Sequence, residues 1–159
     1  MIRVLFVCHG NICRSPMGEF ICKKKIRERN LVGKVDAESA ATSYEEIGNP
    51  VYPPAKKKLT EKGITDFTHK RARHMEKSDY ARFDYIIGMD HMNIRNMLRI
   101  LGKDPEGKVH MMMEYSAEGK RGRIEEVDDP WYTGDFEGVY RQLDEAVDGL
   151  LDEIEAVLD

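Results

Sequence analysis

The feature that most constrains this chain is the junction, near its N-terminus, between a short apolar run and the start of a helix. Residues 4–7 are all apolar, which is typical of a buried strand, and Ser15-Pro16 is typical of an N-cap followed by the first helical position. The backbone N–H groups of the intervening loop can surround a tetrahedral oxyanion where the helix begins. Because Cys8 ends the strand, we expect its thiol to lie beneath the central atom of a bound oxyanion.

The side chains of this loop have distinct expected roles. The helix N-terminus, the converging amides and the guanidinium of Arg14 favour the ionised form of the Cys8 thiol. The planar guanidinium of Arg14 can donate hydrogen bonds to two oxygens of a phosphate-like anion at once, because the spacing of its N–H groups matches that of the oxygens. Ser15 is expected either to cap the helix or to donate a hydrogen bond to the Cys8 sulfur. The other residues shape the loop and bring its amides to the anion: His9, Gly10, Asn11, Ile12 and Cys13.

Two other interpretations of this segment are less well supported. Cys8 could be a buried strand thiol and Arg14 a surface charge, but the strand, the Gly-Asn turn and the Arg-Ser-Pro helix start together favour the anion site. A metal site formed by Cys8, Cys13, Cys22 and His9 matches no common zinc spacing. We therefore expect neither a metal nor another cofactor.

Length, charge and cysteine count narrow the class of protein. The 159 residues lie within the roughly 100–200 typical of one domain, so we expect a single domain over residues 1–159. The net charge of -4 argues against a general affinity for nucleic acid, and no apolar run approaches the roughly 18 residues of a membrane span. Three cysteines, an odd number, and the lack of an apolar signal segment before the first strand indicate a reduced cytoplasm.

Strand-like and helix-like segments alternate along the chain. The expected strands are residues 3–8, 35–42, 84–89 and 108–115. The expected helices are residues 15–30, 55–62, 91–101 and a final helix along which apolar residues recur every three or four positions from Phe136 to Leu158. This alternation predicts an α/β fold, with a mostly parallel sheet, helices on both faces and a ligand at the carboxyl ends of the strands. The Cys8 loop lies at such an end.

Residues 116–133 are expected to form a loop too long to be a mere connection. A carboxylic acid there could protonate a leaving group and then activate water, and Asp129 is the best candidate because the following proline fixes its turn. Asp128 competes for that role one position earlier. Trp131 and Tyr132 provide flat apolar walls that could enclose an aryl ring, although an ordinary Asp-Asp-Pro turn beside a core tryptophan is the simpler alternative.

Together these motifs resemble those of the low-molecular-weight protein tyrosine phosphatase family. The segment Val7–Pro16 resembles the family's signature loop near the N-terminus, and Asp129–Tyr132 resembles its general-acid loop near the C-terminus. Further segments resemble those of the family in the same order: Ser39–Ser43, Ile47–Pro50, Phe83–Ile87 and Met89–Asp90. The resemblance therefore spans nearly the whole chain.

The resemblance implies a three-layer, flavodoxin-like fold with a four-stranded, parallel, twisted sheet. It implies metal-free hydrolysis of phosphotyrosine in protein substrates, with Cys8 as nucleophile, Arg14 as phosphate clamp and Asp129 as acid and then base. It also implies a reversible disulfide between Cys13 and Cys8 that protects the nucleophile, whereas the residues alone fit a buried spectator at Cys13 equally well. We expect a monomer that forms at most a weak dimer.

Three rival functions share parts of this pattern. Arsenate reductases of similar fold relay electrons through downstream cysteines, and this chain has none after Cys22. A related subgroup that acts on phosphoarginine has threonine at the position of Ile12, where isoleucine favours an aryl phosphate instead. An inactive phosphate-binding module would not need Cys8, Arg14 and Asp129 together.

The substrate entrance departs from the family pattern. Many members carry an aromatic residue there, but in this chain Tyr44 lies one position earlier and Glu45 occupies the matching position. The family pattern therefore does not fix the substrate preference of this chain.

Overall fold

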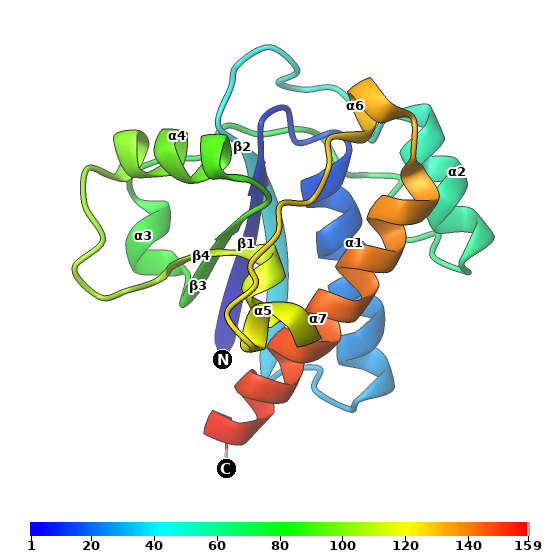
Figure 1. Ribbon diagram of the computed structural model, residues 1–159. Helices are drawn as coiled ribbons and strands as arrows, with labels where there is room; N and C mark the ends of the chain where they lie inside the picture. Colours follow the sequence, from blue (N-terminus) through cyan, green and yellow to red (C-terminus); the bar gives the residue numbers. More distant parts are fainter. Residues whose placement is uncertain (159) are drawn as a thin grey trace.

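The computed structural model describes residues 1–158 and contains a four-stranded parallel sheet between two layers of helices (Figure 1). The strands are β1 (Ile2–Cys8), β2 (Val35–Ala41), β3 (Tyr85–Gly88) and β4 (Val109–Met111). Their order in the sheet is β2-β1-β3-β4. The predicted three-layer α/β architecture is confirmed.

Helices cover the sheet on both sides (Figure 1). On one side, α1 (Arg14–Glu28) packs on β1 and β2, and α2 (Pro53–Glu61) and α7 (Phe136–Leu158) pack beside it. On the other side, α4 (His91–Leu101) packs on β3 and β4. Four short helices complete the chain: α3 (Asp79–Arg82), η1 (Met112–Tyr115), α5 (Ala117–Lys120) and α6 (Pro130–Thr133).

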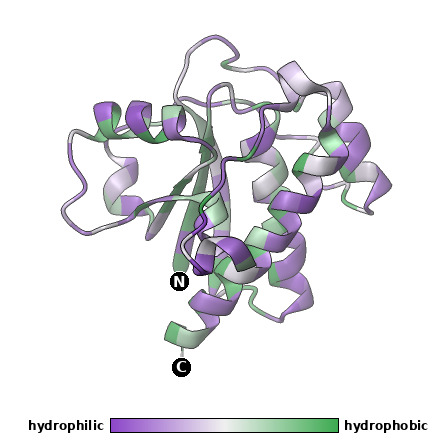
Figure 2. Cartoon of the chain, viewed as in Figure 1, coloured by the Kyte–Doolittle hydropathy of each residue, from purple (hydrophilic) through white to green (hydrophobic). Residues whose placement is uncertain are grey.

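The core has two halves because side chains alternate between the faces of β1. Val4 and Phe6 belong to the apolar cluster beneath α1 and α7, whereas Leu5 and Val7 belong to the cluster beneath α4, and all four side chains are fully buried. The strands β1 and β3 are accordingly mostly apolar, whereas β2 carries Asp36 and Glu38, and the outer faces of the helices are largely hydrophilic (Figure 2). No helix within residues 1–158 is both long and apolar to the degree that crossing a membrane requires.

The strand order creates a ligand site at the carboxyl end of β1. The chain passes from β1 outward to β2 and then crosses back to β3 on the other side of β1, so the connections leave β1 and β3 in opposite directions. Ligands of such sheets bind where the strand order reverses, at the carboxyl ends of the strands. The loop after β1 and the turn before α6 meet at this end of the sheet (Figure 1).

The predicted strand over residues 108–115 is wrong in its extent. Strand β4 ends at Met111, and residues 112–115 form the 3-10 helix η1, which packs on α7. A strand would have sent Met112 and Met113 to opposite faces, whereas the tighter turn buries both. Glu114 closes this turn by accepting a hydrogen bond from the backbone N–H of Met111.

The predicted loop over residues 116–133 contains two short helices. Ser116 begins α5 by accepting a hydrogen bond from the backbone N–H of Gly119 at 2.9 Å, and Asp129 begins α6 in the same way. The sequence pattern also missed α3, whose single turn holds the fully buried carboxylate of Asp79. Helices of one turn are too short to show an apolar period, which explains why they were missed.

Ion pairs join the outer faces of α1 and α7. Lys25 Nζ lies 2.9 Å from both Asp144 Oδ1 and Asp148 Oδ2. Arg29 reaches Asp148 Oδ1 at 2.8 Å and Asp152 Oδ1 at 2.9 Å. Burial alone would lower the pKa of Lys25, but its two carboxylate partners raise it, so the lysine stays charged and fixes α7 against α1.

Gly149→Ala is expected to destabilise the protein, although alanine is the better helix former. A Cβ atom at this position would overlap the carbonyl oxygen of Tyr115, so α7 and η1 would have to move apart. Since overpacking against backbone costs about 1–3 kcal/mol and the helix-propensity gain is about 1 kcal/mol, we expect a net loss of about 1 kcal/mol in the free energy of unfolding, measured with urea.

Ala156→Gly, at an exposed position of the same helix, is the matched control. This substitution changes helix propensity alone and should lower the free energy of unfolding by about 1 kcal/mol. A Gly149→Ala variant more stable than the wild type would contradict the close packing of α7 on η1.

Candidate active site

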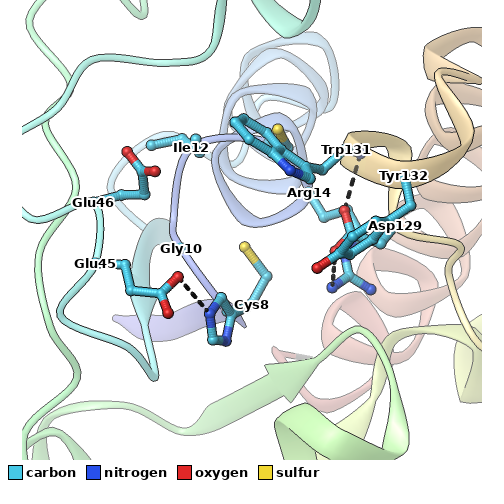
Figure 3. Close-up of a pocket in the computed structure, with 11 residues that line it drawn as sticks. Cys8, Gly10, Ile12, Arg14, Glu45, Glu46, Asp129, Trp131 and Tyr132 are labelled. Atoms are coloured by element: carbon cyan, nitrogen blue, oxygen red, sulfur yellow. Dashed lines mark hydrogen bonds and ion pairs between the residues drawn. The ribbon is translucent and has the colours of Figure 1, made fainter.

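A pocket opens at the carboxyl end of β1, between the loop that follows the strand and the turn that leads into α6 (Figure 3). Its volume is about 220 Å³. The pocket is lined by Cys8, His9, Gly10, Ile12, Cys13, Arg14, Glu45, Glu46, Asp129, Trp131 and Tyr132. The fold thus brings together two predicted motifs from opposite ends of the sequence.

Three residues singled out in the sequence lie outside the pocket wall. Asn11 and Ser15 are buried behind the loop, where they shape it rather than line the cavity. Asp128 is exposed and is absent from the wall, whereas Asp129 is part of it. The geometry therefore favours Asp129 over its neighbour as the carboxylic acid of this site.

Asn11 holds the loop in its unusual conformation. Its φ of 59° lies in the left-handed region, which asparagine tolerates better than most residues. Its side-chain amide nitrogen donates to Ser15 Oγ at 2.8 Å and to Ser39 Oγ at 2.9 Å, and its Oδ1 accepts from the backbone N–H of Arg73 at 3.1 Å. One side chain thus ties the loop to α1, to β2 and to the segment before α3.

Ser15 serves the Cys8 sulfur rather than capping the helix. The prediction of an N-cap at Ser15 is wrong, because α1 already begins at Arg14 and its N-cap residue, Cys13, makes no side-chain cap. Ser15 Oγ lies 3.0 Å from Cys8 Sγ, and the backbone N–H of Ser15 donates to the same sulfur at 3.4 Å. Ser15 Oγ accepts from the amide of Asn11, so its own hydrogen is free to be donated, and the Cys8 sulfur at 3.0 Å is a nearer acceptor than the carbonyl of Ala40 at 3.5 Å.

A buried charge pair supports this hydrogen-bond network from behind. Ser39 Oγ donates to Glu19 Oε1 at 2.6 Å, and Lys70 Nζ donates to the backbone carbonyl of Ser39 at 2.9 Å and lies 3.3 Å from Glu19 Oε1. Burial lowers the pKa of Lys70, and the adjacent carboxylate partly opposes that shift. These three residues were not assigned a role from the sequence, because their contacts join segments far apart along the chain.

Arg14 is a buried cation whose Nη1 makes two hydrogen bonds within the protein. Only 3% of its side chain is exposed, and its Nη1 donates to Asp90 Oδ2 and to the carbonyl of Val127, both at 2.8 Å. Nη2 lies 3.7 Å from Asp129 Oδ2. Burial would lower the pKa of Arg14, but the Cys8 sulfur and the two carboxylates raise it overall, so the guanidinium stays charged.

Asp90 is the functional residue that the sequence left without a role. It is the first residue beyond the 84–89 run that predicted a strand, and its Oδ1 accepts from the backbone N–H of Asn93 at 2.7 Å to cap α4. Its other oxygen orients Arg14. An acidic residue between a buried strand and a helix was the only available signal, and it is shared with many ordinary helix caps.

The turn before α6 places an acid and an aromatic wall over the pocket. Asp129 Oδ1 accepts from the backbone N–H of Trp131 at 3.0 Å, and about a third of the aspartate side chain is exposed. The centroid of the Trp131 ring lies 4.7 Å from the centroid of the Tyr52 ring, so the two rings pack against each other. Tyr132 is largely exposed at the pocket mouth. A flat apolar group that enters the pocket would therefore pass directly beside a carboxyl group.

The other two cysteines are poor nucleophiles. Burial raises the pKa of Cys13 far above that of an ordinary thiol, with further increases from Cys8 and Asp129. Burial likewise raises the pKa of Cys22 to about 12. In residues 1–158, no cluster of three or more His, Cys, Asp or Glu side chains is arranged to hold a metal ion.

Residues 3–158 match the family model described as low molecular weight phosphotyrosine protein phosphatase. The chain is 37% identical, over 155 residues, to the low molecular weight protein-tyrosine-phosphatase YfkJ of Bacillus subtilis. The alignment covers 98% of this chain and 97% of that relative. It is 40% identical, over 143 residues, to the low molecular weight phosphotyrosine protein phosphatase of Gallus gallus, with 87% of each chain covered.

Solved structures give the same result. The crystal structure of YfkJ from Bacillus subtilis aligns with a TM-score of 0.93 at 36% identity, covering 100% of this chain and 98% of the other. A protein tyrosine phosphatase from Entamoeba histolytica, crystallised with Hepes in its active site, aligns with a TM-score of 0.89 at 29% identity and covers 100% of both chains.

Asn11→Ala is expected to lower the free energy of unfolding by about 2–4 kcal/mol, because it combines an unfavourable left-handed alanine with the loss of three hydrogen bonds, two of them buried. Asn30→Ala is the matched control, since Asn30 has a φ of 58° but is exposed. The control should lose only about 1 kcal/mol, the cost of the backbone conformation. Equal losses in the two variants, measured by urea unfolding, would show that the Asn11 side chain does not hold the loop.

Proposed function

This chain belongs to the low-molecular-weight phosphotyrosine protein phosphatase family, and we propose that its pocket hydrolyses phosphotyrosine monoesters through a phosphocysteine formed on Cys8. The observation that carries the proposal is the meeting of a thiol, a buried guanidinium and a carboxyl group in one pocket. Cys8 supplies the nucleophile, Arg14 the phosphate clamp and Asp129 the proton donor. Each group has the chemistry that its step requires.

In the first step, the Cys8 sulfur attacks the phosphorus atom, and an S–P bond forms as the bond between phosphorus and the tyrosyl oxygen breaks. Asp129 gives its proton to that oxygen, which leaves as a neutral phenol. Arg14 and the backbone N–H groups of the loop bind the phosphoryl oxygens and stabilise the charge that they carry in the transition state. Asp90 acts through Arg14 by fixing the direction of the guanidinium.

In the second step, the Asp129 carboxylate takes a proton from water as the water oxygen attacks phosphorus. The S–P bond breaks, inorganic phosphate forms and the sulfur leaves as a thiolate. The hydroxyl and the backbone N–H of Ser15 both point at this sulfur and stabilise its negative charge. Asp129 is protonated again at the end, so the cycle is closed.

The walls of the pocket favour an aryl phosphate. Trp131 and Tyr132 offer flat faces for a phenyl ring, and Ile12 offers an apolar contact where a hydroxyl would suit a more polar phosphoarginine. The test is hydrolysis of phosphotyrosine, phosphoserine and phosphoarginine peptides side by side, in the presence of a metal chelator. Turnover of the phosphotyrosine peptide alone supports the proposal, whereas turnover of the phosphoarginine peptide would show that the protein acts like the related phosphoarginine phosphatases.

Two further functions are weaker candidates. An arsenate reductase would need downstream cysteines to relay electrons, and the chain has no cysteine after Cys22. A phosphate-binding pseudophosphatase would bind phosphopeptides without turnover, so the same assay separates it from an enzyme. We also propose that the protein works as a monomer in the cytoplasm on phosphotyrosine proteins, without binding nucleic acid.

Cys8→Ser is expected to reduce aryl phosphate hydrolysis by at least about 1,000-fold, the scale of loss when a hydrolase loses its nucleophile. Binding of inorganic phosphate should persist, because Arg14 and the loop amides are unchanged; calorimetry measures it. Cys22→Ala, at a buried site away from the pocket, should retain turnover. Sustained turnover by the Cys8→Ser variant would exclude a phosphocysteine intermediate.

Asp129→Asn is expected to slow the hydrolysis of phenyl phosphate by about 100-fold or more, since phenol is a poor leaving group that needs a proton. The loss should be much smaller with 4-nitrophenyl phosphate, whose leaving group departs without one. Rapid-mixing measurements of phenol release report this first step. Asp128→Asn is the control and should slow neither substrate. If phenyl phosphate hydrolysis were slowed in the Asp128→Asn variant and not in Asp129→Asn, Asp128 would be the acid.

A further inference from the structure

The two walls of the pocket mouth differ in chemistry. On one side lie the aromatic rings of Trp131 and Tyr132, and on the opposite side the carboxylates of Glu45 and Glu46, carried by the segment after β2 (Figure 3). The mechanism proposed above uses neither glutamate. Both nevertheless line the cavity that a substrate must enter.

Glu45 lines the mouth because the preceding tyrosine turns away from it. The Tyr44 ring stacks on the ring of His74, with a centroid distance of 3.8 Å and an interplanar angle of 1°, and Tyr44 is not part of the pocket wall. The backbone N–H of Glu45 donates to Ser43 Oγ at 3.0 Å. The backbone N–H of Ala72 donates to the carbonyl of Asn49 at 2.9 Å, which fixes the far end of the segment.

The two carboxylates face the mouth with little compensating charge. Glu45 Oε2 lies 3.1 Å from His9 Nε2, and this histidine carries charge only when protonated. Glu46 packs over Gly10 of the loop, and its Oε2 accepts a hydrogen bond from the neutral amide of Asn49 at 2.7 Å. Among residues 1–158, no lysine or arginine forms an ion pair with either glutamate.

The position of the phosphate determines what meets these carboxylates. A phosphate bound by Arg14 lies at the base of the pocket, so the phenyl ring fills the pocket and the peptide backbone of the substrate lies across the mouth. Side chains next to the phosphotyrosine then pass close to Glu45 and Glu46. Charges at the edge of a binding site raise the association rate of partners of opposite charge and disfavour partners of like charge.

We infer that Glu45 and Glu46 make this enzyme select phosphotyrosines that have lysine or arginine as immediate neighbours, and reject those flanked by aspartate or glutamate. The inference rests on the proposed function, since it names the substrate class of the same pocket. It assigns substrate selection to the segment after β2, whose two glutamates line the pocket mouth opposite Trp131 and Tyr132.

The test compares kcat/KM for two phosphotyrosyl peptides that differ only in whether lysine or glutamate flanks the phosphotyrosine. At low ionic strength the wild type should prefer the lysine peptide by about threefold to tenfold, as expected for a few partly exposed charge pairs. The double variant Glu45→Gln, Glu46→Gln should bring this ratio to about 1, and Glu45→Lys should favour the glutamate peptide. Salt near 1 M should weaken the preference, since charges are then screened within about 3 Å.

Glu28→Gln is the matched control, because it removes the same charge at the far end of α1 and should leave the ratio unchanged. Hydrolysis of 4-nitrophenyl phosphate in every variant reports whether the catalytic groups are intact. A wild-type ratio of about 1, or a preference that survives in the double variant, overturns the inference while the proposed function stands. Hydrolysis of neither peptide would instead overturn the proposed function, and the inference with it.

Discussion

The buried guanidinium of Arg14 is the interaction on which the rest of this site depends. A charge with 3% of its side chain exposed is very costly unless it is paired and hydrogen-bonded. Its partners come from two separate parts of the chain: Asp90 beyond β3, and the segment before α6, which supplies the carbonyl of Val127 and the carboxylate of Asp129. Satisfying one cation therefore holds the late turn over the early loop, and this is how two distant motifs form one pocket.

The same requirement shapes the loop itself. The backbone N–H groups converge on an anion only if the chain turns sharply, and Asn11 supplies the left-handed residue that such a turn needs. Its amide also donates to Ser15 Oγ, which lies 3.0 Å from Cys8 Sγ, so one side chain links the loop conformation to the surroundings of the sulfur. Behind it, the charge pair of Glu19 and Lys70 is buried against Ser39 and keeps that network from shifting. The protein tyrosine phosphatase activity of this family is thus built on polar groups in fixed positions.

Local sequence patterns predicted the strand, the loop and the acidic turn correctly, because each of these is determined by a few adjacent residues. The apolar run before Cys8 and the proline after Asp129 are signals of this kind. The extent of the fourth strand was wrong because consecutive buried methionines fit a strand and a tight helical turn equally well. Of the two roles expected for Ser15, the structure contradicts the N-cap and contains the contact with the sulfur seven residues earlier.

What the sequence could not provide were contacts between distant segments. Asp90, Glu19 and Lys70 lie in ordinary helical or turn contexts, and only the fold brings them to the back of the phosphate loop. The acidic side of the pocket mouth could be predicted in part. The shift of an aromatic residue by one position at Tyr44 was visible in the sequence, but its stacking on His74, which leaves Glu45 at the pocket mouth, required the structure.

The most direct test of the account is to trap the covalent intermediate. The enzyme is mixed with a phosphotyrosyl peptide, quenched in acid within the first turnovers and digested, and the position of the phosphoryl group is read by mass spectrometry. We expect a phosphoryl group on the peptide that contains Cys8, formed at the rate at which the tyrosine peptide is released. Release of phosphate with no phosphoryl group on Cys8, or with one on another residue, would contradict it.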